Sequence, residues 1–415
     1  MSVDTDIFYV IIILYILISE RKNFHMQEYV MGNGAIALGA LAAGVNLVAG
    51  YPGTPSSEIL ETISKYRHDG VYIEWSVNEK AAMEVAAAAA YSGARAMVTM
   101  KQVGLNVAAD PLMSLAYVGV KGGMVIVSAD DPGPISSQTE QDTRRFADFC
   151  RIPVFDPSSP EEAYKMIGEA FEYSEKYNTP VLFRPTTRVC HAYASIDNCD
   201  SPSPKKYEGF VKDSKKWVIF PRLSFANHIM IEKRNVEIGK DFSTYSANKA
   251  EGVNSEKAVV TSGISYAYTK ECLKDYPDVK LIKIATAYPF PEDFVLSSLE
   301  GAKEVLCIEE LSPFIEEQIL KLAGKHGLQL KVSGKLDGKV QAGGENSTDK
   351  IAAILGDFLG KDFTAEGYDL SDAPALPVRP PVLCAGCPHR ASFYAVKQAM
   401  KGRKAYLYSR KRNAS

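Results

Sequence analysis

The residues with the plainest capacity for chemistry stand near the end of the chain. Cys384, Cys387 and His389 form a Cys-x-x-Cys-x-His motif, a set of soft donors of the kind that bind zinc. A structural zinc site needs a fourth ligand, and the sequence offers no second pair nearby. Redox use requires a thioredoxin-like βαβ context, which Pro388 and the Pro-rich stretch before the motif do not supply. The motif therefore stays open between a metal site, a redox site and another role.

A glycine and a threonine mark a second candidate segment, at residues 51–57. Gly53 and Thr54 follow an expected strand, and Pro55 suits the first position of a helix that Thr54 would cap. The free N–H groups of such a helix start can hold an anion. A well-capped turn without any ligand accounts for the same residues.

Further polar groups follow the strands expected later in the sequence. Lys101, Gly104 and Asn106 bring together a cation, a small residue and an amide, which suits an anionic or heteroaromatic ligand. The same set also suits a solvated loop that enters a helix. Asp130 and Asp131 could contribute to a metal site, but no neighbouring cluster completes a ligand shell.

Glu79 opens an alanine-rich helix expected at residues 79–91. A carboxylate in a first helical turn commonly does no more than complement the helix dipole. The functional alternative is specific: in a thiamine diphosphate enzyme, a buried glutamate bonded to the aminopyrimidine ring favours the imino form that removes the thiazolium proton. The alanines favour helix and allow another backbone to approach closely, as at a domain or subunit interface.

The elements that must position these residues are those of an α/β fold. From residue 34 to about residue 189, short apolar runs alternate with helical patterns, which indicates βα units around a mostly parallel sheet. The pattern predicts helices at 34–43, 56–66 and 79–91 and strands at 47–51, 72–75, 96–100, 123–128 and 180–184. In an open, doubly wound sheet, ligands bind beyond the carboxyl ends of the strands, where Thr54, Glu79 and Lys101 are expected.

The second half of the chain repeats this alternation on a smaller scale. Residues 201–255 are polar and charged, which predicts a linker with a helical middle. Beyond them the sequence predicts strands at 258–261, 280–284 and 304–308 and helices at 265–274 and 315–324. A helix at 391–400 and a strand at 404–408 then begin an α/β unit that the polar last residues do not complete.

Composition places the chain among globular proteins that act on small molecules. The net charge is −3, and no basic stripe with interleaved aromatics is present, so a nucleic-acid partner is not expected. Seven scattered cysteines, an odd number, indicate a reduced, cytoplasmic protein. The apolar run at 7–18 is shorter than the roughly 20 residues of a membrane span. We interpret it as translation from an upstream start, with the functional chain beginning near Met26, and a weak membrane anchor is the alternative.

Long segments of the sequence resemble a known family, the alpha subunit of indolepyruvate:ferredoxin oxidoreductase, in order and spacing from about Met31 to Lys404. These segments are residues 50–59, 74–110, 128–144, 303–311 and 384–390. The resemblance implies an α/β fold with a doubly wound thiamine pyrimidine-binding domain and a transketolase C-terminal-like domain. The implied organisation is an N-terminal extension (1–30), the pyrimidine domain (31–200), a linker (201–255), the transketolase-like domain (256–342), a second linker (343–380) and the start of a pyrophosphate-binding domain (381–415).

The family's chemistry assigns roles to the candidate residues. Members decarboxylate arylpyruvates oxidatively with coenzyme A and ferredoxin, and they function with a beta subunit. Glu79 stands at the position of the activating glutamate, and Thr54 would lie near cofactor and substrate. The remaining residues expected at the cofactor are Gly53, Lys101, Gly104, Asn106, Cys384, Cys387 and His389, the last three approaching it rather than holding zinc.

The sequence also departs from the family pattern. Members continue into a complete pyrophosphate domain with a magnesium motif and into cysteine clusters that hold 4Fe-4S centres, and none of these ligands is found here. We therefore expect a truncated chain that is inactive alone. The alternatives are a split enzyme completed by another polypeptide and a non-catalytic, metal-binding relic. The family pattern would also place His at Ile135 and Asn at Thr139, which weakens the expected contribution of that loop.

Overall fold

A computed structural model describes most of the chain. The described residues are 26–67, 69–198, 203–363, 372, 374–375 and 385–403. The described residues up to Phe363 belong to a large unit, and those within Thr364–Arg412 belong to a small unit. The sequence prediction for Cys384 and for a strand at 404–408 lies outside the described residues.

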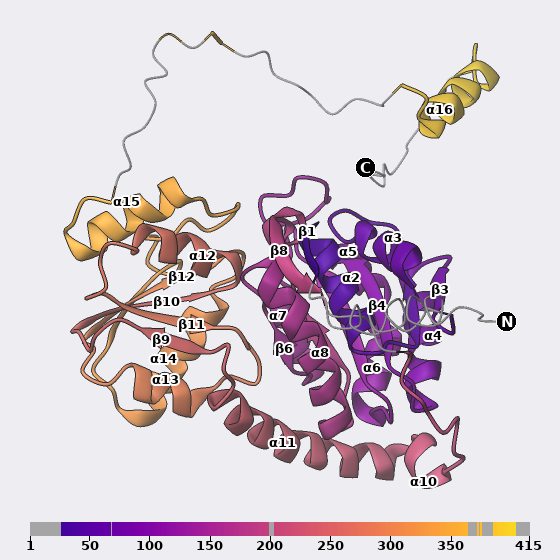
Figure 1. Cartoon of the computed structure of the whole chain (residues 1–415), viewed down its shortest axis with the longest axis horizontal. Coiled ribbons are helices and arrows are strands. Elements are labelled where there is room, and N and C mark those ends of the chain that lie inside the picture. The colour runs from indigo at the N-terminus through magenta and orange to yellow at the C-terminus, as the bar shows by residue number, and fades with distance from the viewer. Residues whose placement is uncertain are drawn as a thin grey trace, which may run out of the picture. The chain divides into compact units, whose positions relative to one another are not determined.

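A six-stranded parallel sheet forms the first part of the large unit, which we call the six-stranded domain (residues 26–198; Figure 1). Its strand order is β3-β2-β4-β5-β7-β6, and every neighbouring pair is parallel. The strands are β2 (Leu47–Gly50), β3 (Tyr72–Trp75), β4 (Ala96–Lys101), β5 (Met124–Ala129), β6 (Val154–Phe155) and β7 (Val181–Phe183). The reversal of strand order between β3-β2 and β4-β5 is that of a doubly wound fold, as the sequence predicts.

Helices cover both faces of this sheet because alternate strand residues are apolar on each side. Met97 of β4 packs among one set of helices, whereas Val98 packs among the other. The helices on the Met97 side include α2 (Gly32–Ala42), α3 (Ser57–Tyr66) and α8 (Pro160–Tyr177). Those on the Val98 side include α4 (Glu79–Tyr91), α6 (Ala109–Val118) and α7 (Thr143–Cys150). Short α5 (Gln102–Val107) follows β4 directly, and α9 (Thr187–His191) follows β7.

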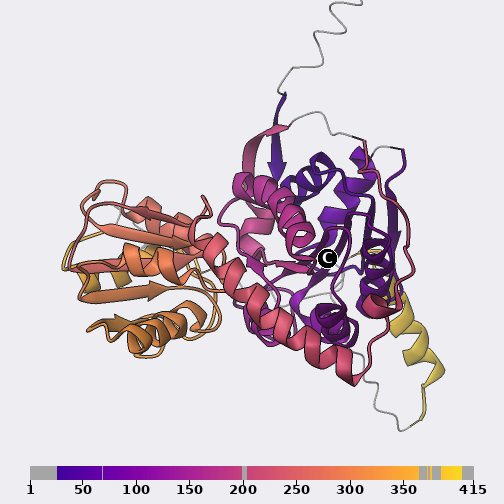
Figure 2. The same cartoon turned by 90° about the horizontal axis from the view of Figure 1, so that it is seen from below.

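Two elements extend from this domain. An antiparallel pair, β1 (Met26–Met31) and β8 (Tyr193–Asn198), was not expected from the sequence. After it come α10 (Ser214–Trp217) and the long α11 (Pro221–Ser243), which Figure 2 shows running from the six-stranded domain to the next sheet. The helix α11 is the helical middle predicted for the segment 201–255.

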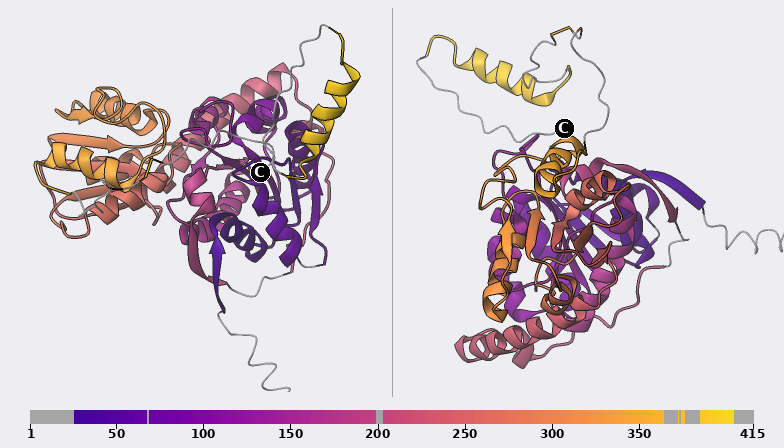
Figure 3. Two further views of the ribbon diagram at one scale, coloured as in Figure 1. Left: turned by 90° about the horizontal axis from the view of Figure 1, so that it is seen from above. Right: turned by 90° about the vertical axis from the view of Figure 1, so that its left-hand side faces the viewer.

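A second sheet of five strands forms the five-stranded domain (residues 249–363; Figure 3). Its order is β13-β12-β10-β11-β9, and all neighbours are parallel except the β9–β11 pair. The strands are β9 (Lys249–Glu251), β10 (Lys257–Ser262), β11 (Lys280–Ile284), β12 (Glu304–Ile308) and β13 (Lys331–Ser333). Its helices are α12 (Gly263–Cys272), α13 (Glu292–Ser298), α14 (Phe314–His326) and α15 (Thr348–Leu359).

The helix α15 lies within the stretch 343–380 that the sequence suggested as a linker. Its Ile351 and Leu355 are fully buried and pack with Val259 of β10, while the helix as a whole packs against α12. Its apolar residues at helical spacing therefore cover the sheet, so this part of the stretch is a structural element rather than a connection.

In the small unit, the structure describes helix α16 (Pro388–Ala399), with Pro388 at its start. The helix predicted at 391–400 thus exists and begins earlier. Throughout the described ranges, no helix combines the length and apolar character needed to cross a membrane.

Candidate functional site

The candidate residues of the six-stranded domain gather at one edge of its sheet. The loops after β2, β3, β4 and β5 all leave the carboxyl ends of parallel strands, so they lie at the same edge. The helix α4, which begins at Glu79, packs on β2, β4 and α5. The fold therefore brings Glu79 to the segment that starts at Lys101.

Glu79 lies at the first turn of α4, where Asn78 caps the helix by accepting the backbone N–H of Ala81 at 2.9 Å. Its side chain faces Gly104: a Cβ atom at Gly104 would lie 2.7 Å from Glu79 Cγ and 2.8 Å from Oε1. Glu79 is only 6% exposed, and its Oε2 has no hydrogen-bond partner among the described residues. The close approach requires glycine at position 104, and it leaves a buried carboxylate oxygen open to a donor.

Gln102 is a second buried acceptor at this edge and is not among the residues that the sequence indicated. It is 1% exposed, and its Nε2 donates to the backbone oxygen of Thr139 at 3.2 Å. That bond fixes the amide orientation, which leaves Oε1 buried without a partner among the described residues. Its place between Lys101 and Gly104 was the signal that could have identified it.

Gly53 and Lys101 are brought together across the β2–β4 pair. A Cβ atom at Gly53 would lie 3.1 Å from Lys101 Cγ and 3.2 Å from Cδ, so the lysine stem runs over the glycine. Lys101 is 8% exposed. Gly53 is held by its N–H, which donates to Ser57 Oγ at 2.9 Å, and by its oxygen, which accepts from Ser56 Oγ at 3.0 Å. The absence of a side chain at Gly53 thus leaves room for the buried Lys101 side chain to lie across the turn after β2.

Asn33 supports this turn from the start of α2 and was also missed. It is fully buried, and its Nδ2 donates to the backbone oxygen of Pro55 at 2.6 Å and to Glu58 Oε2 at 2.8 Å. Oδ1 of Asn33 has no partner within the described part of the chain. An isolated polar residue in an apolar helix, between two glycines, was the available signal.

The loop of residues 131–142 closes one side of the edge. Ser136 Oγ donates to the backbone oxygen of Thr54 at 3.1 Å, and Asn106 Nδ2 donates to Gln141 Oε1 at 3.0 Å. Asn106 is exposed, so the structure places it against this loop at the surface. The predicted site therefore separates into a buried part and an outer part that contacts this loop.

The acidic pair before the loop is structural. Asp130 accepts from Arg184 Nε at 2.7 Å, and Asp131 Oδ2 accepts the backbone N–H groups of Ser136 and Ser137 at 2.9 and 3.0 Å. Burial raises the pKa of Asp130 to about 6 although Arg184 opposes the shift. Within the described ranges no group of three or more His, Cys, Asp and Glu side chains could hold a metal ion.

The Cys-x-x-Cys-x-His motif belongs to the small unit. Cys387 Sγ lies 3.5 Å from His389 Nδ1 at the start of α16, and Cys384 lies outside the described residues. The side chains of Cys387 and His389 therefore lie next to each other. Their expected approach to the cofactor stays a prediction.

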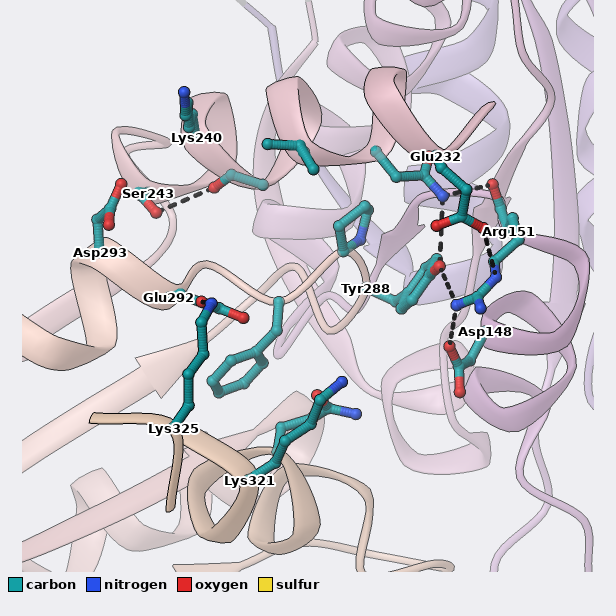
Figure 4. Close-up of a pocket in the computed structure, with 16 residues that line it drawn as sticks. Asp148, Arg151, Glu232, Lys240, Ser243, Tyr288, Glu292, Asp293, Lys321 and Lys325 are labelled. Carbon is teal, nitrogen blue, oxygen red and sulfur yellow. Dashed lines mark hydrogen bonds and ion pairs between the residues drawn. The ribbon is translucent and has the colours of Figure 1, made fainter. Parts of the chain in front are cut away.

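A cavity of about 650 Å³ lies away from this edge, between α11, the loop 288–293 and α14 (Figure 4). Arg151 dominates one end of it, bonded to Tyr288 Oη at 3.1 Å and paired with Glu232 at 3.3 Å and Asp148 at 3.4 Å. The rest of the wall carries further acidic and basic side chains, among them Asp293, Lys321 and Lys325. No residue of the predicted site lines this cavity, so we place the candidate site at the sheet edge.

Comparison with known proteins supplies an independent finding. Residues 38–251 match the family model described as "Pyruvate flavodoxin/ferredoxin oxidoreductase, thiamine diP-bdg". The chain is 41% identical over 376 residues to the indolepyruvate oxidoreductase subunit IorA of Methanothermobacter thermautotrophicus, covering 89% of this chain and 60% of the relative. It is also 41% identical over 384 residues to that of Thermococcus kodakarensis, covering 89% and 59%. The chain thus spans about 60% of the length of the curated relatives it matches.

More distant likeness extends to other enzymes. The 2-oxoglutarate synthase subunit KorA of Methanocaldococcus jannaschii is 26% identical over 358 residues, covering 74% of this chain and 96% of the relative. Among solved structures, a 2-oxoglutarate:ferredoxin oxidoreductase from Magnetococcus marinus superposes with a TM-score of 0.60 at 16% identity, over 74% of this chain and 62% of the other. A split-gene transketolase superposes at 0.51 and 13% identity, over 79% and 97%. Both superpositions show a shared fold.

Proposed function

We propose that Glu79 is the carboxylate that activates the cofactor in oxidative decarboxylation of a 2-oxoacid. The premise is that the chain belongs to the pyruvate flavodoxin/ferredoxin oxidoreductase family of thiamine diphosphate-binding domains. The observation that carries the proposal is the pair of buried acceptors, Glu79 Oε2 and Gln102 Oε1, that no described protein group satisfies. Buried polar atoms normally have partners, and a ligand with donors of its own accounts for both.

The residues at the sheet edge fit the aminopyrimidine of thiamine diphosphate. A heteroaromatic ring that carries N–H donors matches two open acceptors on neighbouring elements. Gly104 leaves room for the Glu79 carboxylate, and the buried stem of Lys101 crosses Gly53 beside it. Glu79 and Gln102 would hold the ring, and the turn after β2 would bound it.

The chemistry divides between cofactor and protein. Thiamine diphosphate supplies, when bound, the carbon nucleophile and the electron sink that decarboxylation of a 2-oxoacid requires. Glu79 contributes a carboxylate that shares a proton with the ring, and burial strengthens that interaction because little water competes for it. Gln102 orients the ring, since its own orientation is fixed by the bond to Thr139.

The finer assignment follows the family resemblance of the sequence together with the relatives' names. We assign arylpyruvates, with indolepyruvate first, as the 2-oxoacid, with coenzyme A as acyl acceptor and ferredoxin as electron acceptor. A beta subunit and the remaining part of the alpha subunit, which in the family carries the magnesium and 4Fe-4S ligands, complete the enzyme in this proposal. We also assign a role in cofactor binding to Cys384, Cys387 and His389 in the completed enzyme.

A complementation assay tests the proposal. The chain is coexpressed with the beta subunit and the unmatched part of the Methanothermobacter thermautotrophicus subunit. Reduction of a low-potential dye is then followed with indolepyruvate, phenylpyruvate, pyruvate or 2-oxoglutarate. We expect cofactor-dependent turnover that is fastest with the arylpyruvates. A preference for 2-oxoglutarate would remove the substrate assignment and leave the reaction class intact.

A matched pair of variants isolates Glu79. Glu79→Gln is expected to lower kcat about 100-fold or more, because the amide cannot share the proton. Glu84→Gln removes an exposed carboxylate from the same helix and is expected to leave kcat unchanged. Equal activity of both variants would withdraw the role assigned to Glu79.

A further inference from the structure

The loop 131–142 contacts the candidate site at two places, the turn after β2 and the side chain of Gln102. Its Ser136 side chain bonds to the turn that holds Thr54, and its Thr139 backbone oxygen holds Gln102 in its orientation. Ser136 and Ser137 are fixed in turn by the Asp131 carboxylate, to which both backbone N–H groups donate. Displacement of this loop would therefore release Gln102 and loosen the turn after β2.

The end of the loop is anchored in the five-stranded domain. Asp142 accepts from Arg144 Nη2 at 2.6 Å and from the backbone N–H of Ser312 at 3.0 Å. Arg144 Nη1 donates to Glu309 Oε2 at 2.8 Å, and its Nη2 donates to the backbone oxygens of Glu310 and Ser312. These side chains are essentially fully buried, so the guanidinium links the two domains without competition from water.

A second anchor lies at the surface. Glu140 Oε1 accepts the backbone N–H of Gly133 at 3.0 Å, within the loop, and that of Gly344 at 2.7 Å, in the five-stranded domain. Gly133 itself approaches the same segment, because a Cβ atom there would lie 3.1 Å from the backbone nitrogen of Glu345. The later end of the loop is therefore bonded to the five-stranded domain, and its start at Gly133 lies against the same segment.

We propose that Arg144 and Glu140 are positioning residues, and that the five-stranded domain acts on the candidate site by holding the loop 131–142 against Gln102 and Thr54. No residue of the five-stranded domain is needed in direct contact with the ligand for this effect. The catalytic consequence rests on the proposed function, whereas the mechanical coupling does not.

Hydrogen–deuterium exchange of the chain tests the coupling directly. Glu140→Ala removes the acceptor shared by Gly133 and Gly344 from the surface without burying a charge. We expect amide exchange in peptides covering 134–141 and 101–107 to accelerate about fivefold or more, with an unchanged unfolding midpoint. Glu140→Gln keeps an acceptor oxygen and is expected to restore protection. Unchanged exchange at 134–141 in Glu140→Ala would overturn the anchor at Glu140.

The buried anchor is tested by Arg144→Lys against Arg145→Gln. Arg145 also joins the two domains, through Glu317 at 2.5 Å, but its side chain does not bond to Asp142 or the loop. We expect faster exchange at 101–107 in the Arg144 variant and wild-type exchange in the Arg145 variant. Equal effects in the two variants would mean that domain contact in general, and not Arg144, holds the loop. If Arg144→Lys does not fold, the Glu140 pair still decides the proposal.

Turnover of the complemented enzyme separates this inference from the proposed function. Glu140→Ala is expected to lower kcat about tenfold with a smaller change in KM, because it misplaces Gln102 rather than removing a ligand contact. Wild-type kcat combined with accelerated exchange would overturn the positioning role. If Glu79→Gln were fully active, the proposed function would fail while the exchange result would stand.

Discussion

Two buried polar clusters in this molecule behave in opposite ways. At the junction of the two domains, Arg144, Asp142 and Glu309 satisfy one another and the backbone around them. At the sheet edge, Glu79 and Gln102 are also buried, yet each keeps an acceptor oxygen without a described partner. Saturation is typical of a structural cluster, whereas the open acceptors support the ligand site that we propose at the second.

Pairing of opposite charges explains why the junction between the two domains can bury three charged side chains. Burial alone would raise the pKa of Asp142, but the Arg144 guanidinium outweighs it and lowers that pKa to about 2. The same guanidinium also faces Glu309, whose two oxygens accept the N–H groups of Ile315 and Glu316 at 3.0 Å. Each charge therefore depends on its partner, and removal of one leaves the others uncompensated.

The largest expected effect breaks the saturated cluster. Arg144→Met should lower the free energy of unfolding by about 3 to 5 kcal/mol, because Asp142 and Glu309 would stay buried without a cation. Urea denaturation measures the loss. Arg145→Met removes a partly exposed ion pair and is expected to cost about 1 kcal/mol or less. Comparable losses would show that the junction is no more demanding than a surface pair.

Beside the junction, Glu310 is expected to make stability depend on pH, because its pKa is raised whereas that of Asp142 is lowered. Burial raises the pKa of this carboxyl to about 7, and the N–H of Asn346 partly opposes the shift. The folded state therefore binds the proton more tightly, so this contribution to stability is complete below pH 4.5 and is lost as pH rises through about 7. Glu310→Gln keeps the acceptor and should exceed wild type by about 1 to 3 kcal/mol at pH 8. Urea titrations at pH 5 and pH 8 measure the difference, and an equal gain at both values would contradict this origin.

At the open cluster, a methyl group should disturb the site more than the fold. Gly104→Ala places Cβ against the Glu79 carboxylate, so the side chain must move, and we expect a loss of stability of about 1 kcal/mol with a loss of most activity. Gly324→Ala is the control, since nothing lies within 4 Å of its Cβ in α14, and helix propensity should make it slightly stabilising. Thermal unfolding and the complementation assay check the pair. Full activity of Gly104→Ala would show that the close approach is not required.

The sequence predicted the elements that are buried and strongly patterned. The strand at 72–75 has the predicted bounds although its residues are only partly buried or exposed. The strands at 280–284 and 304–308 and the helix at 79–91 also have the predicted bounds, and their buried strand residues and an unbroken alanine-rich segment determine them locally. The three-residue strands β9 and β13, with exposed residues and no such run, were not predicted because their pairing depends on neighbouring strands.

The candidate site was predictable as a set of loops and not as a set of contacts. Parallel strands bring Thr54, Glu79 and Lys101 to one edge, which follows from topology. The role of Gln102 depends on a backbone oxygen far along the chain, at Thr139, and no local pattern encodes such a bond. Likewise, Asp131 was considered as a metal ligand, whereas the structure makes it the acceptor that shapes its own loop.

The smallest change in stability is expected for substitution of Glu79. Comparing this change with that of Arg144→Met tests whether the two clusters differ in kind. Glu79→Met removes a buried carboxylate whose Oε2 has no described partner, so the desolvation cost disappears together with a favourable helix-dipole interaction. These terms oppose each other, and we expect a net change within about 1 kcal/mol of wild type. Urea denaturation of the chain without cofactor measures it. A loss as large as that of Arg144→Met would mean that Glu79 is held by protein contacts, and the open cluster would then be structural like the junction.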